Sequence, residues 1–514
     1  MTHPHHSNVG RVYLVGAGPG APELITLRGV ACLRKADVIL YDYLINPLLL
    51  RHARPDAVKV SLGRHGRERI WKQAEINAEL VRLGLAGKTV VRLKSGDPSV
   101  FGRGAEEGEV LAEAGIPFEV VPGITAGLAA SSYGGIPITH REFSSAVALV
   151  TGHEDADKTS SSLDFSALAS FPGTLVFYMG VTTVDRWSSA LLQAGKPADT
   201  PVGIIRRCSF PDQQVMTSTL GKVAQEYPKE RLRPPVIFLV GEACTWQPSL
   251  GWFSQRPLFG QRIAITRPES QAASLVEPLS DLGAEVFVSP TISISPAEDT
   301  GPLDHSITHL DQFDWLVFSS TNGVEYFFHR LFDLEYDLRQ LGKIRIAAVG
   351  SGTAEALANY HLKADLVPPE FRAESLSAAL IPQLKPGANR LLLIRANRGR
   401  DVLPQELTAA GASVTQVVAY SSIDIPSPDP ILLDKLTTGQ LDWVTVTSSA
   451  IAKSLVRLYG DELRQAKLVS ISPITTATLT ELGYPPAAEA ASFSMEGIVE
   501  AIRTFSPPTS GTST

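Results

Sequence analysis

Three features of this sequence predict an α/β protein with more than one domain. The chain has 514 residues, which is too long for a single hydrophobic core. Short apolar runs alternate with helical patterns from Arg11 to about residue 503, which is typical of mostly parallel sheets covered by helices. The second half of the chain also repeats itself, which indicates two similar lobes there.

In the first half, strands and helices alternate from the N-terminal end. VYLVGAGPG, from Val12, predicts a buried strand that ends in a glycine turn, and LRGVACLRKA, from Leu27, predicts the next helix. VILYDYL, from Val38, and TVVRLKSGDP, from Thr89, predict further strands. The glycine turn lacks the third glycine of a dinucleotide-binding motif, so by itself it indicates only that something approaches the backbone closely.

A change in composition and periodicity marks the expected domain boundary. Residues 246–259 contain prolines, glycines and aromatic side chains but no periodic pattern, and they predict a linker that packs on a neighbouring domain. The α/β pattern resumes at RIAITRP, from Arg262. We therefore expect domains at 10–245 and 260–503 on either side of this linker.

Composition argues against several classes of protein. The formal net charge is −7, whereas nucleic-acid binders are usually basic, so no nucleic-acid partner is expected. Cys32, Cys208 and Cys244 form no CxxC pair, which argues against a disulfide framework or a structural zinc site. No stretch approaches the roughly 18 apolar residues of a membrane span, and residues 1–8 lack the apolar core of a signal peptide. We expect a cytoplasmic protein with no metal and no membrane partner.

The second half contains three ordered matches with itself. RIAITRP is echoed by LLLIRAN, DWLVFSSTNGV by DWVTVTSSAIA, and AAVGSGTAEAL by VSISPITTATL. The paired positions lie 128, 128 and 122 residues apart, namely Arg267 and Arg395, Asp314 and Asp442, and Thr353 and Thr475. A nearly constant offset over three matches predicts two similar α/β lobes, each too large to be a solenoid repeat.

Each repeat places a hydroxyl cluster where a strand gives way to a helix. The clusters are Ser319, Ser320 and Thr321 in one repeat and Thr447, Ser448 and Ser449 in the other. Hydroxyls and free N–H groups at helix starts can bind anions beyond the strand ends. Plain helix capping by Ser and Thr explains the same residues equally well. Two lobes that present such donors to a shared cleft would suit a large polyanion.

The TR opening and the FSSTNGV, VVAY and SPITTA segments resemble uroporphyrinogen-III synthase over roughly 260–503. The resemblance implies two α/β lobes that are interleaved in the chain, one from 260–294 plus 423–503 and the other from 297–420. It also implies a cleft that binds hydroxymethylbilane, a linear tetrapyrrole with eight carboxylates, and closes its ring to uroporphyrinogen III. This substrate closes unaided, so we expect positioning rather than a strong acid–base pair.

The same resemblance implies site residues for the synthase half. The expected substrate-binding residues are Thr321, Thr353, Ser448 and Thr475. Tyr420 falls on the family's usual tyrosine and is the candidate that assists departure of the hydroxyl, although a packed, hydrogen-bonded aromatic is an equal alternative. Ser472 stands where the family has a glycine, which bears on the local turn.

The first half has further polar turns at its strand ends. Asp42 in YDYLI ends a strand among apolar neighbours as a lone carboxylate, and the SGDP turn carries Gly96 and Asp97 ahead of a helix. Asp97 could cap that helix or meet a ligand hydroxyl. VPGITAG supplies another glycine turn, which enters a helix of small residues at Thr125 and Ala126 and predicts a floor for a flat ring.

GAGPG, YDYL, RLKSGDPSVFGRG, VPGITA, GIPITHR and YMG together resemble uroporphyrinogen-III C-methyltransferase over about 10–245. The resemblance implies two α/β lobes with S-adenosyl-L-methionine between them, and a homodimer formed through this domain. It places the cofactor site at Pro19, Ser95, Gly96, Asp97, Val100, Thr125, Ala126, Met179 and Cys208. Cys208 stands where the family has a glycine, and SGD stands where it has GGD.

Two residues carry the catalytic expectation for the methyltransferase half. Asp42 aligns with the family's proton acceptor, and burial among apolar groups would suit a carboxylate to act as a base. A structural cap or ion pair is the alternative. The family's lysine proton donor falls on Arg64, and because arginine stays protonated we interpret it as a clamp on substrate carboxylates.

If both resemblances hold, the chain performs consecutive steps. The second half makes uroporphyrinogen III, and the first half methylates it at two carbons to precorrin-2, which feeds sirohaem or cobalamin. One alternative is that the first half is a later precorrin methyltransferase. The other is that the second half is a non-catalytic tetrapyrrole sensor.

Overall fold

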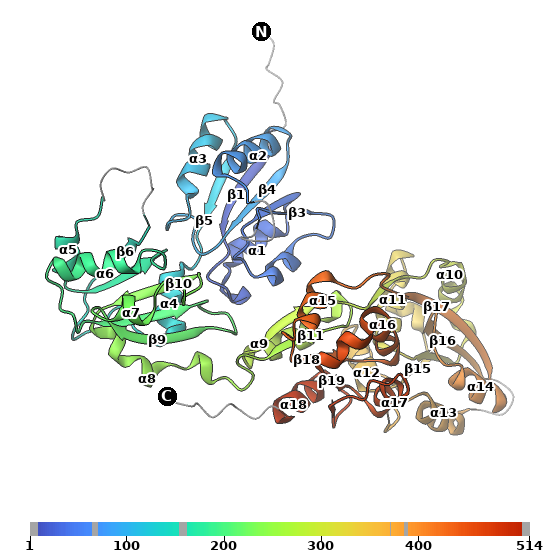
Figure 1. Ribbon diagram of the computed structural model, residues 1–514. Coiled ribbons are helices and arrows are strands. Elements are labelled where there is room, and N and C mark those ends of the chain that lie inside the picture. Colours follow the sequence, from blue (N-terminus) through green and yellow to red (C-terminus); the bar gives the residue numbers. More distant parts are fainter. Residues whose placement is uncertain (1–8, 64–69, 154–161, 371, 385–388, 506–514) are drawn as a thin grey trace, which may run out of the picture. The chain divides into compact units, whose positions relative to one another are not determined.

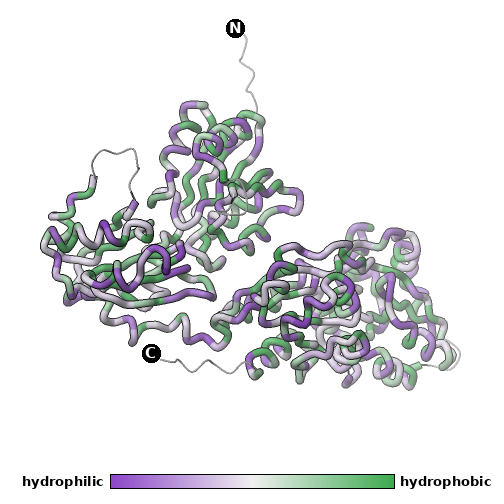
Figure 2. Tube along the Cα trace, viewed as in Figure 1, coloured by the Kyte–Doolittle hydropathy of each residue, from purple (hydrophilic) through white to green (hydrophobic). Residues whose placement is uncertain are grey.

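The chain folds into two compact units, Met1–Gly260 and Gln261–Thr514 (Figure 1). The structure is a computed structural model that describes residues 9–63, 70–153, 162–370, 372–384 and 389–505. Within these residues each unit contains two five-stranded sheets with helices packed on them, so the predicted α/β class is confirmed. The strands are mainly hydrophobic, as expected for sheets covered on their faces (Figure 2).

The first lobe of the first unit is an all-parallel sheet of order β3-β2-β4-β1-β5. Its strands are β1 (Arg11–Gly16), β2 (Val38–Tyr41), β3 (Val58–Ser61), β4 (Thr89–Lys94) and β5 (Phe118–Val121). Its helices are α1 (Leu27–Leu33), α2 (Gln73–Leu85) and α3 (Gly104–Glu113), with 3-10 turns η1 (Pro22–Leu24) and η2 (Pro47–His52). α1 covers one face, and α2 and α3 cover the other. All five strand ends therefore meet at one edge.

The second lobe of the first unit has the strand order β6-β7-β10-β8-β9. Its strands are β6 (Val147–Thr151), β7 (Thr174–Tyr178), β8 (Pro201–Arg206), β9 (Gln214–Thr219) and β10 (Val236–Val240). Its helices are α4 (Ala126–Gly134), α5 (Phe165–Ala169), α6 (Val184–Gln193) and α7 (Val223–Glu226). Only β6 and β7 pair in parallel, so the expectation of mostly parallel strands is wrong for this lobe. Residues 207–213 are too short for a crossover between β8 and β9, which forces antiparallel pairing.

The aromatic segment 246–259 packs within the first unit. It forms short helices, which its composition did not predict: the end of η3 (Glu242–Trp246), α8 (Gln247–Leu250) and η4 (Phe253–Gln255). Trp252 Nε1 donates to the carbonyl of Ser132 at 3.0 Å, and the buried Phe253 ring lies edge-on to Tyr133 at 4.7 Å. These contacts fix the segment against the end of α4.

The second unit also has two sheets, which we call lobe A and lobe B. Lobe A has the order β12-β11-β18-β19-β20, with strands β11 (Arg262–Ile265), β12 (Glu285–Val288), β18 (Trp443–Val446), β19 (Lys467–Ser470) and β20 (Ala488–Glu489). Lobe B has the order β13-β17-β16-β14-β15, with strands β13 (Ile292–Pro296), β14 (Trp315–Phe318), β15 (Arg345–Ala348), β16 (Arg390–Ala396) and β17 (Ser413–Asp424). The lobes are interleaved in the chain as expected, because the chain crosses to lobe B at β13 and returns after β17.

Helices cover both lobes of the second unit. Lobe A carries α9 (Ala273–Asp281), α15 (Pro430–Thr437), α16 (Ser449–Tyr459), α17 (Pro473–Glu481) and α18 (Met495–Phe505), with η5 (Glu269–Gln271) and η9 (Gly460–Gln465). Lobe B carries α10 (Gly301–Thr308), α11 (Thr321–Asp333), α12 (Ser351–Ala358), α13 (Ala373–Leu380) and α14 (Val402–Ala409), with η6 (Leu310–Gln312), η7 (Leu338–Leu341) and η8 (Ile381–Gln383).

The internal repeat of the sequence is a structural repeat. The order β12-β11-β18-β19 in lobe A corresponds strand for strand to β17-β16-β14-β15 in lobe B. Trp315 and Trp443 occupy matching positions at the starts of β14 and β18, and both are almost fully buried. The lobes therefore share one plan, with helix starts at matching strand ends.

Each unit has its own hydrophobic core, so damage to one core should leave the other folded. We predict that Trp443→Ala destabilises the second unit by about 3–5 kcal/mol, because it removes a fully buried ring that packs edge-on against Phe505. Hydrogen–deuterium exchange should rise in β18 and β19 and stay unchanged in β1 and β4. The half-exposed Trp246 provides a control, and Trp246→Ala should change the second unit little. Equal loss of protection in both units would contradict separate cores.

Candidate functional sites in the two units

The ends of β1, β4 and β5 are packed together through glycines. A Cβ atom added to Gly123 would lie 2.2 Å from the carbonyl oxygen of Gly96, and one added to Gly16 would lie 2.6 Å from the Cα of Gly123. Gly18 and Gly96 exchange backbone hydrogen bonds of 3.2 and 2.8 Å. Larger residues at these contacts would separate the loops, which explains the glycine turns of the sequence.

The SGDP turn is held to its neighbours by the carboxylate of Asp97. One oxygen accepts from the N–H of Ser99 at 2.7 Å, and the other accepts from the N–H of Gly123 at 2.9 Å. Gly96 adopts φ +68°, and an added Cβ there would lie 3.7 Å from Ala126 N and 3.8 Å from Thr125 Cα, an ordinary contact distance, so the left-handed backbone rather than crowding favours glycine. Asp97 therefore fixes the loops, and Gly96 supplies the left-handed turn beside the start of α4.

Tyr178, at the end of β7, holds the start of α4. Its hydroxyl lies 2.9 Å from Thr125 Oγ1 and accepts from the N–H of Gly127 at 2.9 Å. Burial raises the pKa of this phenol, so it stays a neutral hydrogen-bonding group. Thr125 is the residue before α4, with Ala126 as its first residue. Met179 follows Tyr178 with φ +53° and a half-exposed side chain, so these predicted cofactor residues lie around one junction.

The GAGPG turn meets the turn after β8. The N–H of Ala21 donates to Ser209 Oγ at 2.9 Å, and Gly20 packs directly on the Phe210 ring. Pro19 and Cys208 therefore lie in adjoining turns. The Cys208 thiol is buried in the apolar core of the second lobe, which raises its pKa, so this side chain serves packing. Val100 packs against the same core.

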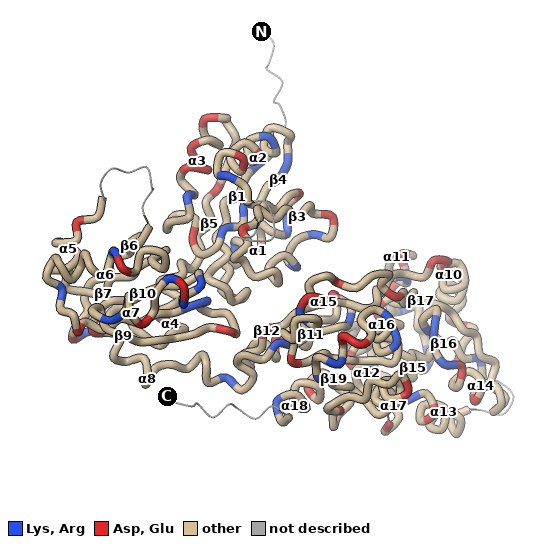
Figure 3. Tube along the Cα trace, viewed as in Figure 1, with Lys and Arg blue, Asp and Glu red and all other residues tan. Residues whose placement is uncertain are grey.

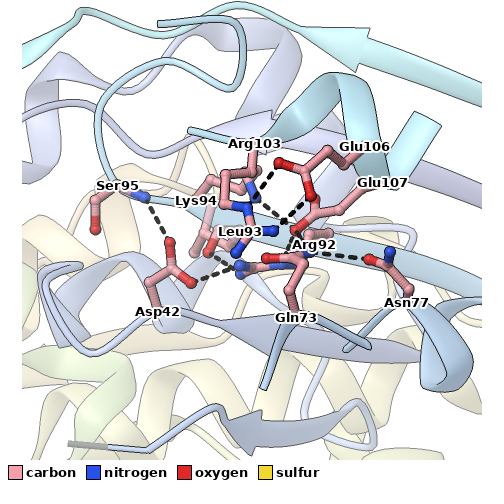
Figure 4. Close-up of polar contacts among 10 residues, drawn as sticks. All are labelled: Asp42, Gln73, Asn77, Arg92, Leu93, Lys94, Ser95, Arg103, Glu106 and Glu107. Carbon is pink, nitrogen blue, oxygen red and sulfur yellow. Dashed lines mark hydrogen bonds and ion pairs between the residues drawn. The ribbon is translucent and has the colours of Figure 1, made fainter. Parts of the chain in front are cut away.

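Asp42 belongs to a buried network of charged side chains (Figure 4). Its carboxylate pairs with Arg92 Nη2 at 2.6 Å and accepts from the N–H of Ser95 at 3.2 Å. Arg92 also contacts Glu107 at 3.2 Å, and Lys94 Nζ lies 2.6 Å from the same carboxylate oxygen. The interpretation of Asp42 as a lone carboxylate among apolar groups is therefore wrong. The ion pair that was the alternative is present.

Because this network is buried, its cations need a counter-ion within the protein. Glu107 is fully buried, and Arg92 and Lys94 are each 3% exposed. Burial, together with repulsion from Arg92, lowers the pKa of Lys94, while Glu107 and Asp42 oppose that shift. A buried cation without a counter-ion is costly, so Glu107 is what permits two cations on one face of β4.

The second unit has a cavity of about 520 Å³ between lobes A and B. It is lined by residues Arg267, Ser270, Gln271, Ala273, Ser274, Ser320, Thr321, Asn322, Glu325 and Thr353. Thr321 and Thr353, both predicted to bind substrate, face this space. Ser320 caps α11 by accepting from the N–H of Gly323 at 3.1 Å, so it serves capping and lines the cavity at once.

Tyr420 does not line the cavity itself, but its hydroxyl contacts Ser320, which does. Its hydroxyl is 3.0 Å from Ser320 Oγ, and its ring packs in the lobe B core beside Tyr326. Burial raises the pKa of Tyr420, and hydrogen bonds from Ser320 and Asn322 partly offset the effect. Its packed, hydrogen-bonded state is thus established, and its hydroxyl remains connected to the cavity through Ser320.

The remaining predicted residues of the synthase half lie at helix starts of lobe A. Ser448 caps α16 by accepting from the N–H of Ile451 at 3.2 Å. Thr475, in the first turn of α17, is almost fully buried and lies 3.3 Å from the hydroxyl of Ser472. Ser472 has φ −161°, an extended conformation open to any residue, so the turn does not need the family's glycine. Neither Ser448 nor Thr475 lines the cavity. Arg64 lies outside the residues that the structure describes.

Sequence reasoning missed several residues that organise these sites. Arg92 and Lys94 alternate within a buried strand, and charges two residues apart share one face, so this pattern could have been read as a buried charged site. Glu107 gave no such signal, because EE in a helix is usually solvated. Tyr178, Ser209 and Asn322 act through contacts between distant segments, which the sequence does not show.

The fold is that of a two-unit α/β protein, and each unit has its own candidate ligand site. The chain matches the family profile described as tetrapyrrole (corrin/porphyrin) methylases over residues 11–224, and the profile described as uroporphyrinogen-III synthase HemD over residues 273–500.

Similar proteins show the same two parts. A porphyrin biosynthesis protein HemD from Ruminiclostridium josui is 35% identical over 453 residues, which cover 88% of this chain and 89% of that protein. A uroporphyrinogen-III C-methyltransferase from Bacillus subtilis is 40% identical over 65% of this chain and 68% of its own length. An S-adenosyl-L-methionine-dependent uroporphyrinogen III methyltransferase from Methanosarcina barkeri is 46% identical over 48% of this chain and 96% of its own length.

The chain belongs to the uroporphyrinogen-III C-methyltransferase family, as a fusion with a uroporphyrinogen-III synthase domain. It is a bifunctional enzyme of tetrapyrrole biosynthesis. Across the described ranges, no helix is long and apolar enough to cross a membrane. The described side chains also include no group of three or more His, Cys, Asp or Glu residues arranged for a metal ion.

The contrast between neighbouring acids in α3 gives a direct test of the buried network. We predict that Glu107→Gln destabilises the first unit by about 3–5 kcal/mol, because Arg92 and Lys94 lose their shared counter-ion. Glu106→Gln should cost at most about 1 kcal/mol, because its pair with Arg103 is solvent-exposed. Chemical denaturation of both variants measures the difference. Similar small losses in both would show that the buried charges do not support the fold.

Proposed function

We propose that the second unit closes hydroxymethylbilane to uroporphyrinogen III and that the first unit methylates this product at two carbons to precorrin-2. Two findings support consecutive steps on one chain: the family membership of each half, and separate sites in the two units. The observation that carries the methylation step is Asp42, held by Arg92 and the N–H of Ser95 next to the glycine turn at Gly96.

The residues of the first unit fit S-adenosyl-L-methionine as the methyl donor. The hydroxyl of Ser95 is buried and has no hydrogen-bond partner among the described residues. Gly96 turns the backbone with φ +68° next to Thr125 and Ala126, and the Met179 side chain is half exposed. We propose that the cofactor is held by Pro19, Ser95, Gly96, Asp97, Val100, Thr125, Ala126, Met179 and Cys208. When bound, it supplies a methyl group on a sulfonium, and the role of the protein is mainly positioning.

Asp42 is the proposed base of the methylation. The methylated tetrapyrrole must lose a proton, and the Asp42 side chain at the strand end is 29% exposed and so can be reached from solvent. Arg92 and the N–H of Ser95 fix its orientation. We propose that Arg64 binds a substrate carboxylate, because a guanidinium remains charged and offers paired donors.

In the second unit, positioning is again the main task. The hydroxyls of Thr321 and Thr353 and the amide of Asn322 line the cavity and supply donors for a polycarboxylate. Ser448 and Thr475 are proposed to act from lobe A. Tyr420 is proposed to assist departure of the substrate hydroxyl through Ser320, and its raised pKa keeps it a proton-bearing donor at neutral pH.

Two assays test these activities on the full chain. Hydroxymethylbilane supplied without S-adenosyl-L-methionine should yield uroporphyrinogen III, whereas isomer I alone would support the sensor alternative. Uroporphyrinogen III with labelled S-adenosyl-L-methionine should gain two methyl groups, and transfer only to a later precorrin would support the other alternative. A homodimer through the methyltransferase half and a cytoplasmic location are further proposals, which sedimentation equilibrium and cell fractionation would test.

Removal of the carboxylate of Asp42 should separate the two activities. We predict that Asp42→Asn lowers the methylation rate by about 10²–10⁴-fold, the usual contribution of a positioned base. Ring closure should be unchanged, because Asp42 belongs to the other unit. Asp56→Asn is the control, since Asp56 is 72% exposed in a surface pair with Arg54. Unchanged methylation in Asp42→Asn would exclude Asp42 as the base.

The phenol of Tyr420 can be tested without removing its ring. We predict that Tyr420→Phe lowers kcat for formation of uroporphyrinogen III by about 10²-fold, the low end of the usual contribution of a positioned proton donor, because Tyr420 acts through Ser320. Tyr326→Phe should have little effect, since Tyr326 only stacks on Tyr420 at 5.7 Å. Chromatographic separation of the uroporphyrin isomers gives the rate. If the two variants behave alike, Tyr420 has only a packing role.

A further inference from the structure

The two repeats of the second unit each have an arginine at a matching position, but the arginines differ in their interaction partners. Arg395 in lobe B pairs with Asp401 at 2.7 Å and with the amide oxygen of Gln416 at 2.6 Å. Its counterpart in lobe A, Arg267, contacts Ser274 Oγ at 3.0 Å, Gln271 Oε1 at 3.2 Å and Met495 Sδ at 2.7 Å. Among the described residues no carboxylate pairs with Arg267.

Arg267 is also incompletely hydrogen-bonded. Its Nε is buried and has no partner among the described residues. Burial lowers its pKa, and no acidic neighbour opposes that shift, yet a guanidinium remains charged at any working pH. A half-buried cation without a counter-ion is unfavourable, so an anion from outside the chain would stabilise it.

Arg267 stands where such an anion can reach it. It lines the cavity between lobes A and B together with Ser320, Thr321 and Asn322. The other charged side chain that lines the cavity is Glu325, on α11. The wall therefore offers one guanidinium with hydroxyl and amide donors near it, a combination that suits carboxylate recognition.

A chain of side chains joins Arg267 to Tyr420. Arg267 donates to Gln271, whose amide donates to Asn322 across the lobes, and Asn322 is hydrogen-bonded to the phenol of Tyr420. Gln271 belongs to lobe A, whereas Asn322 and Tyr420 belong to lobe B. A ligand group bound at Arg267 would therefore be connected through hydrogen bonds to Tyr420, the residue proposed to assist departure of the substrate hydroxyl.

We propose that Arg267 binds a carboxylate of the linear tetrapyrrole substrate and anchors it between the lobes. This inference rests on the proposed ring-closing function of the second unit and adds to it a binding residue and the substrate group that the residue recognises. The paired N–H donors of the guanidinium match the two oxygens of a carboxylate. This role explains the difference between the repeats. In lobe B the arginine is paired with Asp401, whereas in lobe A the arginine is available to the substrate.

The test compares Arg267→Gln with the wild-type chain in ring closure. We expect KM for hydroxymethylbilane to rise about ten- to one hundred-fold, the usual cost of a lost charge-assisted contact, with kcat within about threefold. Arg267→Lys, which keeps the charge but loses the fork, should give an intermediate KM. Only formation of isomer III is counted, so spontaneous closure does not enter the rate.

Arg395→Gln is the matched control and should leave KM unchanged, because Arg395 is paired within lobe B. The unfolding midpoint of Arg267→Gln should not fall, since a cation without a counter-ion is removed. An unchanged KM in Arg267→Gln would overturn the inference, and so would a lowered midpoint with parallel loss of kcat, which marks a structural role. An equal rise of KM in Arg395→Gln would overturn it as well. Wild-type protein that forms only isomer I would instead overturn the proposed function itself.

Discussion

Parallel pairing decides where each site of this chain can form. When neighbouring strands run the same way, their carboxyl ends share one edge of the sheet, and the loops after them must pack together. In the first lobe the order β2-β4-β1-β5 sets Asp42, the SGDP turn, the GAGPG turn and Gly123 side by side. Close packing of Gly16, Gly96 and Gly123 then follows, because the strands are about 4.8 Å apart and leave no room for side chains between the loops. The helix starts of the second unit follow from the same constraint.

Charge in the interior adds a second constraint to the first lobe. Arg92 and Lys94 project from the same face of β4, and Glu107 reaches them from α3, so a strand and a helix that are separate in the sequence are joined by one carboxylate. Arg92 in turn holds Asp42 after β2. The fold and the proposed base therefore depend on one network. Elsewhere, charges of both signs are interspersed along the two units, where solvent screens them (Figure 3).

The sequence was informative where a local pattern has one structural solution. Apolar runs that end in glycine predicted β1 and β4, and the repeat offset predicted two similar lobes, which the matching strand orders of lobes A and B confirm. It failed where the outcome depends on distant partners. The short turn at 207–213 made β8 and β9 antiparallel, and Asp42 gained Arg92 from a strand about fifty residues away. Helix capping and a position at the cavity could not be told apart beforehand for the hydroxyls at helix starts, since Ser320 caps α11 and also lines the cavity. The roles assigned to individual site residues remain predictions.

A duplicated fold need not keep a duplicated function, and the second unit shows how the difference is made. Both repeats retain a tryptophan at the start of the same strand, a serine cap on the next helix and an arginine at a matching strand end. The two repeats differ in the groups that contact this arginine. These include the carboxylate of Asp401 in lobe B, whereas in lobe A they are hydroxyl, amide and thioether groups. The packed core sets the fold of each lobe, whereas an unpaired charge favours ligand binding. Two lobes with the same fold can therefore present different charges to one ligand.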